Sequence, residues 1–244
     1  MKFTITKRQE KILNGVVREY INSAEPVSSQ FLDEKYNFDV SPATLRNEMQ
    51  TLCDLDFLFQ PHTSAGRIPT DKGYRFFVNE IFERGFSDFD NQKKLDIKKE
   101  CKKKIDNSFR LTQEVTKILA SNSSNLALGH LLDEDFFWKD GWDDLFEEPE
   151  FKEADFISRF AKLINSFEKN IEEINSSFSN DIQVFIGKET PFFRNEDFSI
   201  VVSRFNYPNL KNKKGMFAIV GPKRMNYNKN ISIINMLDQI FKEF

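Results

Sequence analysis

Hydrophobic residues recur at helical spacing near the start of the chain and predict two short helices there. Thr6 and Gln9 can form a capping box, in which each side chain binds the backbone N–H of the other residue. The apolar stripe that follows, to about Asn22, consists of Ile12, Leu13, Val16, Val17, Tyr20 and Ile21. Ser28 can cap a second helix that ends near residues 36–37. Both helices therefore have an apolar side that must pack against another element.

A third helix is predicted over residues 42–55, because Ser41 can cap it and Pro42 suits its first position. Its apolar stripe is formed by Leu45, Met49 and Leu52. The opposite face carries Ala43, Arg46, Asn47, Gln50 and Asp54. Arginine, asparagine and glutamine have the donors and acceptors that read guanine and adenine edges in DNA. A solvated helix face usually contains the same residue types, so this face alone leaves both interpretations open.

The segment after the third helix predicts a tight ribbon with a basic tip. Residues 57–59 suit a short strand, and residues 64–66 supply the turn to Arg67 and Ile68. Thr70 then caps another helix, whose apolar side consists of Tyr74, Phe77, Val78, Ile81 and Phe82. Three helices followed by such a ribbon indicate a winged helix-turn-helix, which places its third helix in a DNA groove. With the ribbon beside it, DNA contact becomes the favoured interpretation of the third helix.

Beyond a boundary expected at residues 85–88, the pattern predicts further helices. A lysine-rich run at residues 93–104 indicates a solvated helix face, with contact to DNA phosphates as the alternative, and its helix is expected to continue through Leu119. Residues 121–125 have the composition of a loop. Residues 133–155 mix acidic and aromatic side chains. They suit either a folded helical edge or a docking surface for a partner, and the folded edge is favoured because aromatic rings favour burial.

The last third of the chain changes to strands. An amphipathic helix is expected over residues 156–174, followed by strands over residues 182–186, 198–202 and 216–220. The closing helix carries Ile231, Ile234, Leu237, Phe241 and Phe244. Helices followed by strands predict an α+β fold.

Composition limits the possible chemistry. The chain has 244 residues, a formal net charge of −3 and a pI of about 5.6, so no overall basic charge indicates nucleic-acid binding. Residues 60–77 are nevertheless locally basic. Cys53 and Cys101 are the only cysteines and lie far from any histidine pair, so we expect no zinc site. No apolar run approaches the length of a membrane span, and we expect a soluble cytoplasmic protein.

The sequence gives little support for an enzyme. His62 and His130 are the only histidines, and neither lies near a cysteine or a nucleophile signature. No glycine motif that cradles a phosphate is present. We therefore expect no catalysis, no cofactor and no metal, and we interpret His62 as a phosphate or base contact at the ribbon tip.

Three motifs in order carry a resemblance to a known family: SPATLRNEM at residues 41–49, PHTSAGRIPTDKGYR at residues 61–75 and GPKRMNY at residues 221–227. Together they resemble the HrcA family, the heat-inducible transcription repressors of bacteria. The resemblance implies a winged helix joined to a GAF-like domain with an inserted dimerisation domain. It also implies repression of chaperone operons through an inverted-repeat operator, with the GroEL chaperonin helping to keep the repressor active. The positions that meet DNA by this resemblance are Ser41, Thr44, Arg46, Asn47, His62, Thr63, Ser64 and Arg67.

The chain also departs from the family pattern. Between Leu128 and about Leu131 it passes almost directly into sequence that resembles the family's later helices. The inserted domain and part of the GAF-like sheet are therefore expected to be absent.

These observations give one working hypothesis. We predict an α+β protein with a winged helix-turn-helix at residues 1–85 and a reduced GAF-like regulatory and dimerisation domain at residues 86–244. Its expected function is repression of chaperonin and DnaK-type heat-shock genes as a homodimer on double-stranded DNA, with GroEL as a further partner. The alternative is a winged helix that binds only proteins. The complete candidate DNA-binding set is Ser28, Ser41, Thr44, Arg46, Asn47, Gln50, His62, Thr63, Ser64, Arg67 and Lys72.

Overall fold

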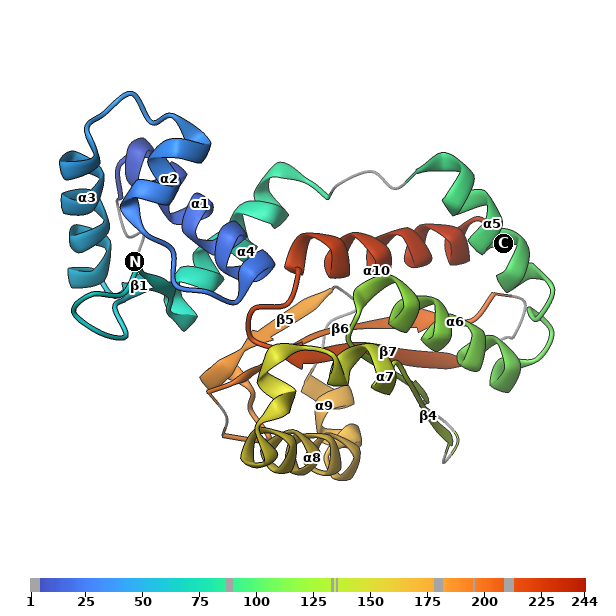
Figure 1. The fold of residues 1–244 in the computed structure, drawn as a ribbon. Coiled ribbons are helices and arrows are strands. Elements are labelled where there is room, and N and C mark those ends of the chain that lie inside the picture. Colours follow the sequence, from blue (N-terminus) through green and yellow to red (C-terminus); the bar gives the residue numbers. More distant parts are fainter. Residues whose placement is uncertain are drawn as a thin grey trace. The chain divides into compact units, whose positions relative to one another are not determined.

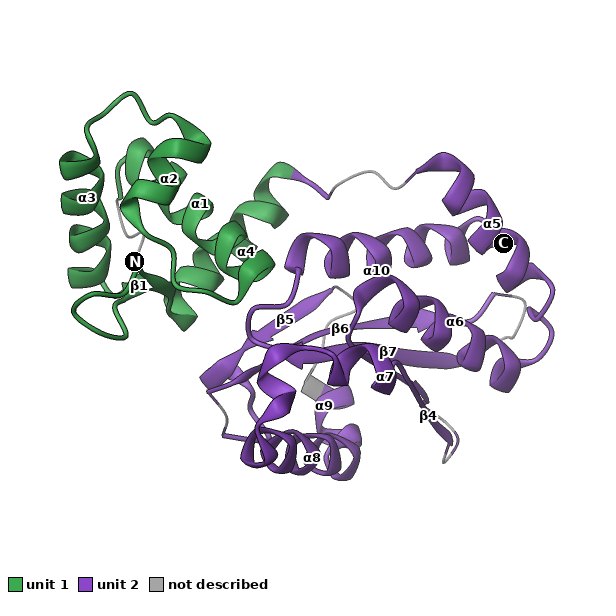
Figure 2. Cartoon of the chain, viewed as in Figure 1, with its two compact units in different colours: residues 1–84 green, residues 85–244 purple. Residues whose placement is uncertain are grey.

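A computed structural model describes residues 5–86, 90–132, 134, 136–177, 182–194, 196–208 and 213–244. The chain divides into two compact units, Met1–Arg84 and Gly85–Phe244 (Figure 2). The expected boundary at residues 85–88 lies partly outside the described residues, because Ser87 and Asp88 are not among them.

The described residues of the first unit form four helices and a two-stranded ribbon (Figure 1). Its elements are α1 (Lys7–Ser23), α2 (Ser29–Tyr36), α3 (Pro42–Asp54), β1 (Leu58–Phe59), β2 (Ile68–Pro69) and α4 (Asp71–Arg84). The predicted caps are confirmed: the hydroxyls of Thr6, Ser28 and Ser41 accept from the backbone N–H three residues ahead at 3.1–3.2 Å. Thr70 caps α4 in the same way, at 3.1 Å from the amide of Gly73.

The apolar stripes of these helices meet in one core. Leu45, Met49 and Leu52 of α3 are buried, and α3 packs against α1 and α2. Gly73, in the first turn of α4, allows the closest approach, because a Cβ atom there would lie 2.2 Å from the carbonyl oxygen of Phe57. This arrangement confirms the predicted winged helix.

The second unit is built around a five-stranded antiparallel sheet in the order β4-β3-β7-β6-β5. Its strands are β3 (Leu126–Leu131), β4 (Phe136–Asp140), β5 (Gln183–Ile186), β6 (Phe198–Asn206) and β7 (Lys214–Pro222). Its helices are α5 (Asn91–Lys102), α6 (Ser108–Ser123), α7 (Trp142–Phe146), α8 (Ala154–Lys169), α9 (Ile171–Ser177) and α10 (Tyr227–Lys242), with short 3-10 turns η1 (Pro149–Lys152) and η2 (Gly187–Glu189).

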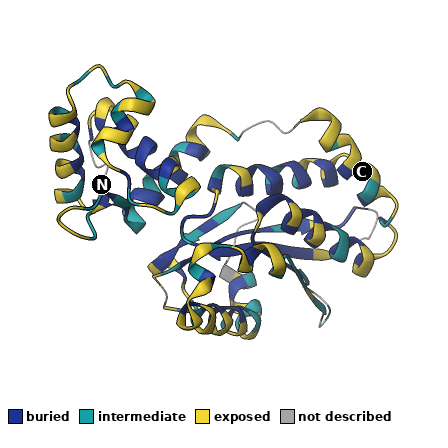
Figure 3. Ribbon diagram, viewed as in Figure 1, coloured by how far each residue is buried: buried dark blue, intermediate teal, exposed yellow. Residues whose placement is uncertain are grey.

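Helices cover both faces of this sheet, with α6 and α10 on one side and α8 and α9 on the other (Figure 1). On the α6 side, Gly129 of β3 permits close packing, since a Cβ atom there would lie 2.2 Å from the hydroxyl oxygen of Thr116. On the α8 side, Phe160, Leu163 and Phe167 are buried against the sheet. The buried residues therefore concentrate in the sheet and on the helix sides that face it (Figure 3). The α+β fold class is confirmed.

The described residues of the second unit form five strands where the pattern predicted three. The three predicted strands are present as β5, β6 and β7, but β3 and β4 were missed. The expected helical edge at residues 133–155 is wrong in part, since residues 136–140 pair with β3 as a strand. Asp133 and Asp135 of that segment lie outside the described residues. Strand pairing prevails at residues 136–140 because β3 offers a free sheet edge, and Phe137 then packs against Phe167 at 6.4 Å between ring centroids.

Helix limits differ at three places. The lysine-rich helix does not continue to Leu119, because α5 ends at Lys102 and Asn107 caps a new helix, α6. The expected loop at residues 121–125 is largely helix, since α6 extends to Ser123 and its C-cap residue Ser124 adopts a left-handed backbone conformation. The helix expected over residues 156–174 is interrupted at Asn170, which separates α8 from α9.

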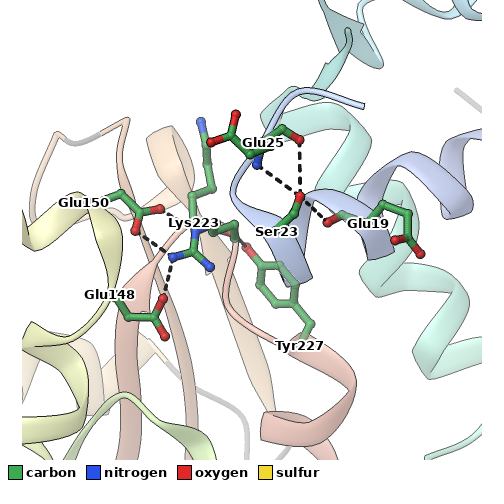
Figure 4. Close-up of polar contacts among 8 residues, drawn as sticks. Glu19, Ser23, Glu25, Glu148, Glu150, Lys223 and Tyr227 are labelled. Atoms are coloured by element: carbon green, nitrogen blue, oxygen red, sulfur yellow. Dashed lines mark hydrogen bonds and ion pairs between the residues drawn. The ribbon is translucent and has the colours of Figure 1, made fainter. Parts of the chain in front are cut away.

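The GPKRMNY motif fixes the acidic segment to the sheet. Arg224 forms ion pairs with Glu148 and Glu150. The carboxylates of these two glutamates lie near each other in Figure 4. Burial lowers the pKa of Arg224, but hydrogen bonds from its guanidinium to Glu150 and Glu148 outweigh this and raise it above its ordinary value. The Tyr227 hydroxyl donates to the carbonyl of Lys223 at 2.5 Å and fixes the turn before α10. These contacts support the folded-edge interpretation of this part of the acidic segment.

Candidate nucleic-acid interface

The outer face of α3 presents polar side chains to solvent. Arg46 and Asn47 are exposed, and within the described part of the chain neither side chain forms a hydrogen bond or an ion pair. Ser41 caps the helix, and its hydroxyl also lies 3.0 Å from the Thr44 hydroxyl. The donors of Arg46 and Asn47 are thus available to a ligand, while Ser41 and Thr44 lie together at the helix N-terminus.

The wing is tied to the segment before α2. The backbones of Val27 and Arg67 exchange hydrogen bonds of 2.8 and 2.9 Å, which adds a third strand position beside β2. Gly66 permits this approach, because a Cβ atom there would lie 2.4 Å from the carbonyl carbon of Val27. The wing is therefore held against the body of the unit by backbone contacts.

Gln60 shapes the wing loop from inside. Its side-chain amide donates to the carbonyls of Thr63 and Ala65, both at 3.0 Å. His62, Thr63 and Ser64 are exposed on that loop. This role of Gln60 was not predicted from the sequence, because nothing in the local pattern distinguishes it from an ordinary polar residue.

Arg67 does not lie on the surface. Its side chain is buried, with its guanidinium donating to Gln50 Oε1 at 3.1 Å and more weakly to the Ala65 carbonyl at 3.4 Å. Gln50 in turn donates to Asp54 at 2.9 Å. The expectation that Arg67 contacts DNA does not fit this position, because the guanidinium is engaged in joining the wing to α3.

Cys53 lies on the inner edge of α3, near Arg67. Burial raises the pKa of its thiol, and the nearby Arg67 guanidinium lowers it by less. The thiol is therefore protonated at neutral pH and poorly reactive. No group of three histidine, cysteine or carboxylate side chains in the described part of the chain is placed to bind a metal ion.

Lys72 also has a partner within the unit. Its Nζ donates to the Leu55 carbonyl at 2.6 Å, just past the end of α3, and lies 4.4 Å from the centre of the Phe57 ring. A lysine in this position satisfies a free helix-end carbonyl. The structure gives Lys72 a structural role, in contrast to the DNA contact expected from the sequence.

One cleft joins α2, α3 and the wing. Its volume is about 330 Å³, and it is lined by Ser28, Arg46, Thr63, Ser64 and Arg67 among the predicted site residues. Ser28 contributes the first turn of α2, where backbone N–H groups favour an anion. The remaining predicted residues lie on the outer face of α3, at its N-terminus, on the wing loop or, for Lys72, at the start of α4. The structure thus brings most of the predicted set to one side of the unit.

Comparison with known proteins identifies the family. The family model for the HrcA protein C-terminal domain matches residues 78–231. The heat-inducible transcription repressor HrcA of Natranaerobius thermophilus is 48% identical over 124 residues, which span 50% of this chain and 36% of that protein. The HrcA repressor of Thermodesulfovibrio yellowstonii is 27% identical over 333 aligned positions, spanning 95% of each. Since this chain has only 244 residues, that alignment contains gaps where the relative has residues that this chain lacks.

A solved structure shares the fold of this chain. A crystal structure described as a hypothetical protein matches 98% of this chain and 98% of its own length, with a TM-score of 0.71 and 21% identity. None of the helices among the described residues is long and apolar enough to cross a membrane. The match over residues 78–231 covers well over half of the sequence. The chain belongs to the HrcA family of heat-inducible transcription repressors.

Proposed function

We propose that this protein represses transcription by placing α3 in the major groove of an inverted-repeat operator while its wing contacts the adjacent backbone. The observation that carries the proposal is the outer face of α3, where Arg46 and Asn47 have free donors beside a wing fixed in place. A helix of this kind fits the major groove, and arginine and asparagine are suited to guanine and adenine edges.

The remaining candidate residues divide by position. Ser28, Ser41 and Thr44 lie at helix N-termini, and His62, Thr63 and Ser64 lie on the wing, so we assign them to phosphates and sugars. Gln50 and Arg67 hold the wing against α3. Their effect on binding is therefore expected to come through the position of the wing.

Replacing Arg46 with alanine tests the central assignment. We expect this change to weaken operator binding by about 1–3 kcal/mol and to relax preference at one base position, because a bidentate base contact is lost. Affinity for operator and random duplexes would be measured by fluorescence anisotropy at several salt concentrations. Arg110→Ala, at an exposed arginine of the second unit, is the matched control. Equal losses on operator and random DNA would contradict base reading by Arg46, and no specific binding by the unaltered protein would favour the protein-binding alternative.

Lys72→Met tests the structural role of that lysine. We expect the free energy of unfolding of the first unit to fall by about 1 kcal/mol, since one hydrogen bond to a helix-end carbonyl is lost. The slope of log affinity against log salt should stay unchanged. Urea unfolding and salt-dependent DNA titrations measure the two quantities, with the exposed Lys102→Met as control. Unchanged stability with a slope smaller by about one would assign Lys72 to a phosphate.

We further propose that the operator-bound form is a homodimer, because an inverted repeat requires two-fold symmetry in its reader. The second unit is proposed as the regulatory and dimerisation part. Sedimentation with and without operator tests the dimer, and a strict monomer at all concentrations would refute it.

Chaperone genes are the proposed targets of repression, and mapping the chromosomal sites that the protein occupies before and after heat shock tests them. GroEL is the proposed further partner. Measuring operator binding after heating, with and without GroEL, tests the chaperonin as a partner.

A further inference from the structure

A basic groove runs along α1, away from the residues already assigned to DNA. It has a volume of about 520 Å³ and is lined by α1, the turn between α2 and α3, and the end of α4. Its cationic residues are Lys7, Arg8, Lys11 and Arg18 on α1 and Arg84 on α4. The spacing of Lys7, Lys11 and Arg18 by four and seven residues places them on one side of the helix.

Several of these charges are not neutralised. Lys7, Lys11 and Arg18 are exposed and form no ion pair with any other residue that the structure describes. Arg8 and Arg84 have carboxylate partners at 3.4 and 2.6 Å. The groove therefore keeps a net positive charge along its length.

The carboxylates near the groove do little to reduce this charge. Among the described residues that line it, Asp39 is the one carboxylate. The carboxylate of Glu19, in the last turns of α1, already has two partners: Lys35 and Tyr36 donate hydrogen bonds to it at 2.6 and 2.5 Å. Burial raises the pKa of Glu19, but these hydrogen bonds lower it by more, so the carboxylate is ionised and its charge is met by Lys35. It is therefore not available to neutralise Arg18.

The position of the groove relative to α3 is set by two sets of contacts. Arg8 and Gln9 of α1 bind Glu48 at 3.4 and 2.9 Å, whereas the wing binds Gln50 through Arg67. At about 100° per residue, Glu48 and Gln50 lie on opposite edges of α3 with the exposed Asn47 between them. Arg8, which lines the groove, and the wing thus contact α3 on opposite sides of Asn47.

We infer that this groove binds the phosphodiester backbone of the DNA on the side of α3 opposite the wing. Lys7 and Arg18 are separated by about 16 Å along the helix axis, at about 1.5 Å per residue. Charges spread over that length cannot converge on one phosphate group, so we assign them to successive phosphates of one strand. When α3 lies in the major groove, a DNA backbone strand runs along each side of α3. The wing reaches only one of these two strands. This inference rests on the proposed function and extends the interface to a second, sequence-independent contact.

The test is a triple variant, Lys7→Gln, Lys11→Gln and Arg18→Gln, made in the full chain. We expect affinity for operator and random duplexes to fall by the same factor, and the slope of log affinity against log salt to decrease by about two to three. Hydroxyl-radical footprints should lose protection on the backbone at one side of α3 only. Circular dichroism and urea unfolding would establish that the variant folds.

A control with the same charge change separates local contact from overall electrostatics. Lys99→Gln, Lys102→Gln and Lys103→Gln alter exposed lysines of α5, of which Lys99 and Lys103 already pair with Asp96 and Glu100. The control should leave the salt slope and footprint unchanged. A folded triple variant of α1 with unchanged slope and footprint, while the parent protein binds the operator specifically, would refute the inference and leave the proposed function intact. Absence of specific binding by the parent protein would instead overturn the proposed function.

Discussion

Gly66→Ala is expected to displace the wing and lower operator affinity about tenfold or more. The added Cβ atom would lie 2.4 and 2.5 Å from the carbonyl carbon and oxygen of Val27 and 2.6 Å from the carbonyl carbon of Pro26. These are backbone atoms that cannot rotate away, so the hydrogen bonds between Val27 and Arg67 must lengthen or break. We expect the free energy of unfolding of the first unit to fall by about 2–3 kcal/mol. A tenfold loss of affinity corresponds to about 1.4 kcal/mol of lost contacts.

The measurement compares thermal unfolding and DNA binding with those of Gly15→Ala. Gly15 lies inside α1, and a Cβ atom there would meet only side-chain atoms, the nearest being Leu32 Cδ2 at 3.3 Å. The same substitution at Gly15 removes a helix-interior glycine, so its stability should be unchanged or higher by up to about 1 kcal/mol. Wild-type stability and affinity in Gly66→Ala would show that the close approach of the wing to Val27 is not required.

Arg224→Met is expected to produce the largest loss of stability in the second unit. The Arg224 side chain is 10% exposed and forms a two-pronged contact with Glu150 and a further ion pair with Glu148. Its removal leaves two neighbouring carboxylates that repel each other. We expect the free energy of unfolding to fall by about 2–3 kcal/mol, less than the roughly 3–5 kcal/mol of fully buried pairs because both carboxylates remain partly in water.

Tryptophan fluorescence during urea unfolding isolates this effect, because Trp138 and Trp142, the two tryptophans, both belong to the second unit. Lys242→Met is the control, since its pair with Asp238 is mostly exposed and worth about 0.5 kcal/mol or less. Adding Glu148→Gln and Glu150→Gln to the Arg224→Met protein should remove the repulsion between the two carboxylates and recover part of the stability that Arg224→Met lost. An Arg224→Met protein as stable as the control would mean that the GPKRMNY motif does not stabilise the acidic segment.

Local sequence signals accounted for the elements of the first unit. The hydroxyls of Thr6, Ser28, Ser41 and Thr70 cap their helices as expected because capping depends on residues only three positions apart. The apolar stripe of α3 likewise follows from helical periodicity alone. For the same reason the exposed position of Arg46 and Asn47 follows from the sequence pattern of α3.

The second unit shows where local signals fail. The strands β5, β6 and β7 are rich in β-branched and aromatic residues and were predicted, whereas β4 contains residues that suit a strand or an amphipathic edge equally well. β4 pairs with the neighbouring strand β3, and β3 is itself held in the sheet by β7, which lies far along the chain, so no local pattern reports this pairing.

Periodicity, caps and composition were sufficient to predict the winged helix, the α+β class and the residue types offered to a ligand. Which basic side chains are free depends instead on the folded structure. Arg67 and Lys72 lie in the most basic stretch of the DNA-binding motif, yet their charges are engaged by Gln50 and by the Leu55 carbonyl. Lys7, Lys11 and Arg18 line a groove beside α3 although they lie outside that motif. The reason is that a side chain is available only when folding brings no partner to it from a distant part of the chain. Here folding brings Gln50 of α3 to Arg67 and the Leu55 carbonyl to Lys72.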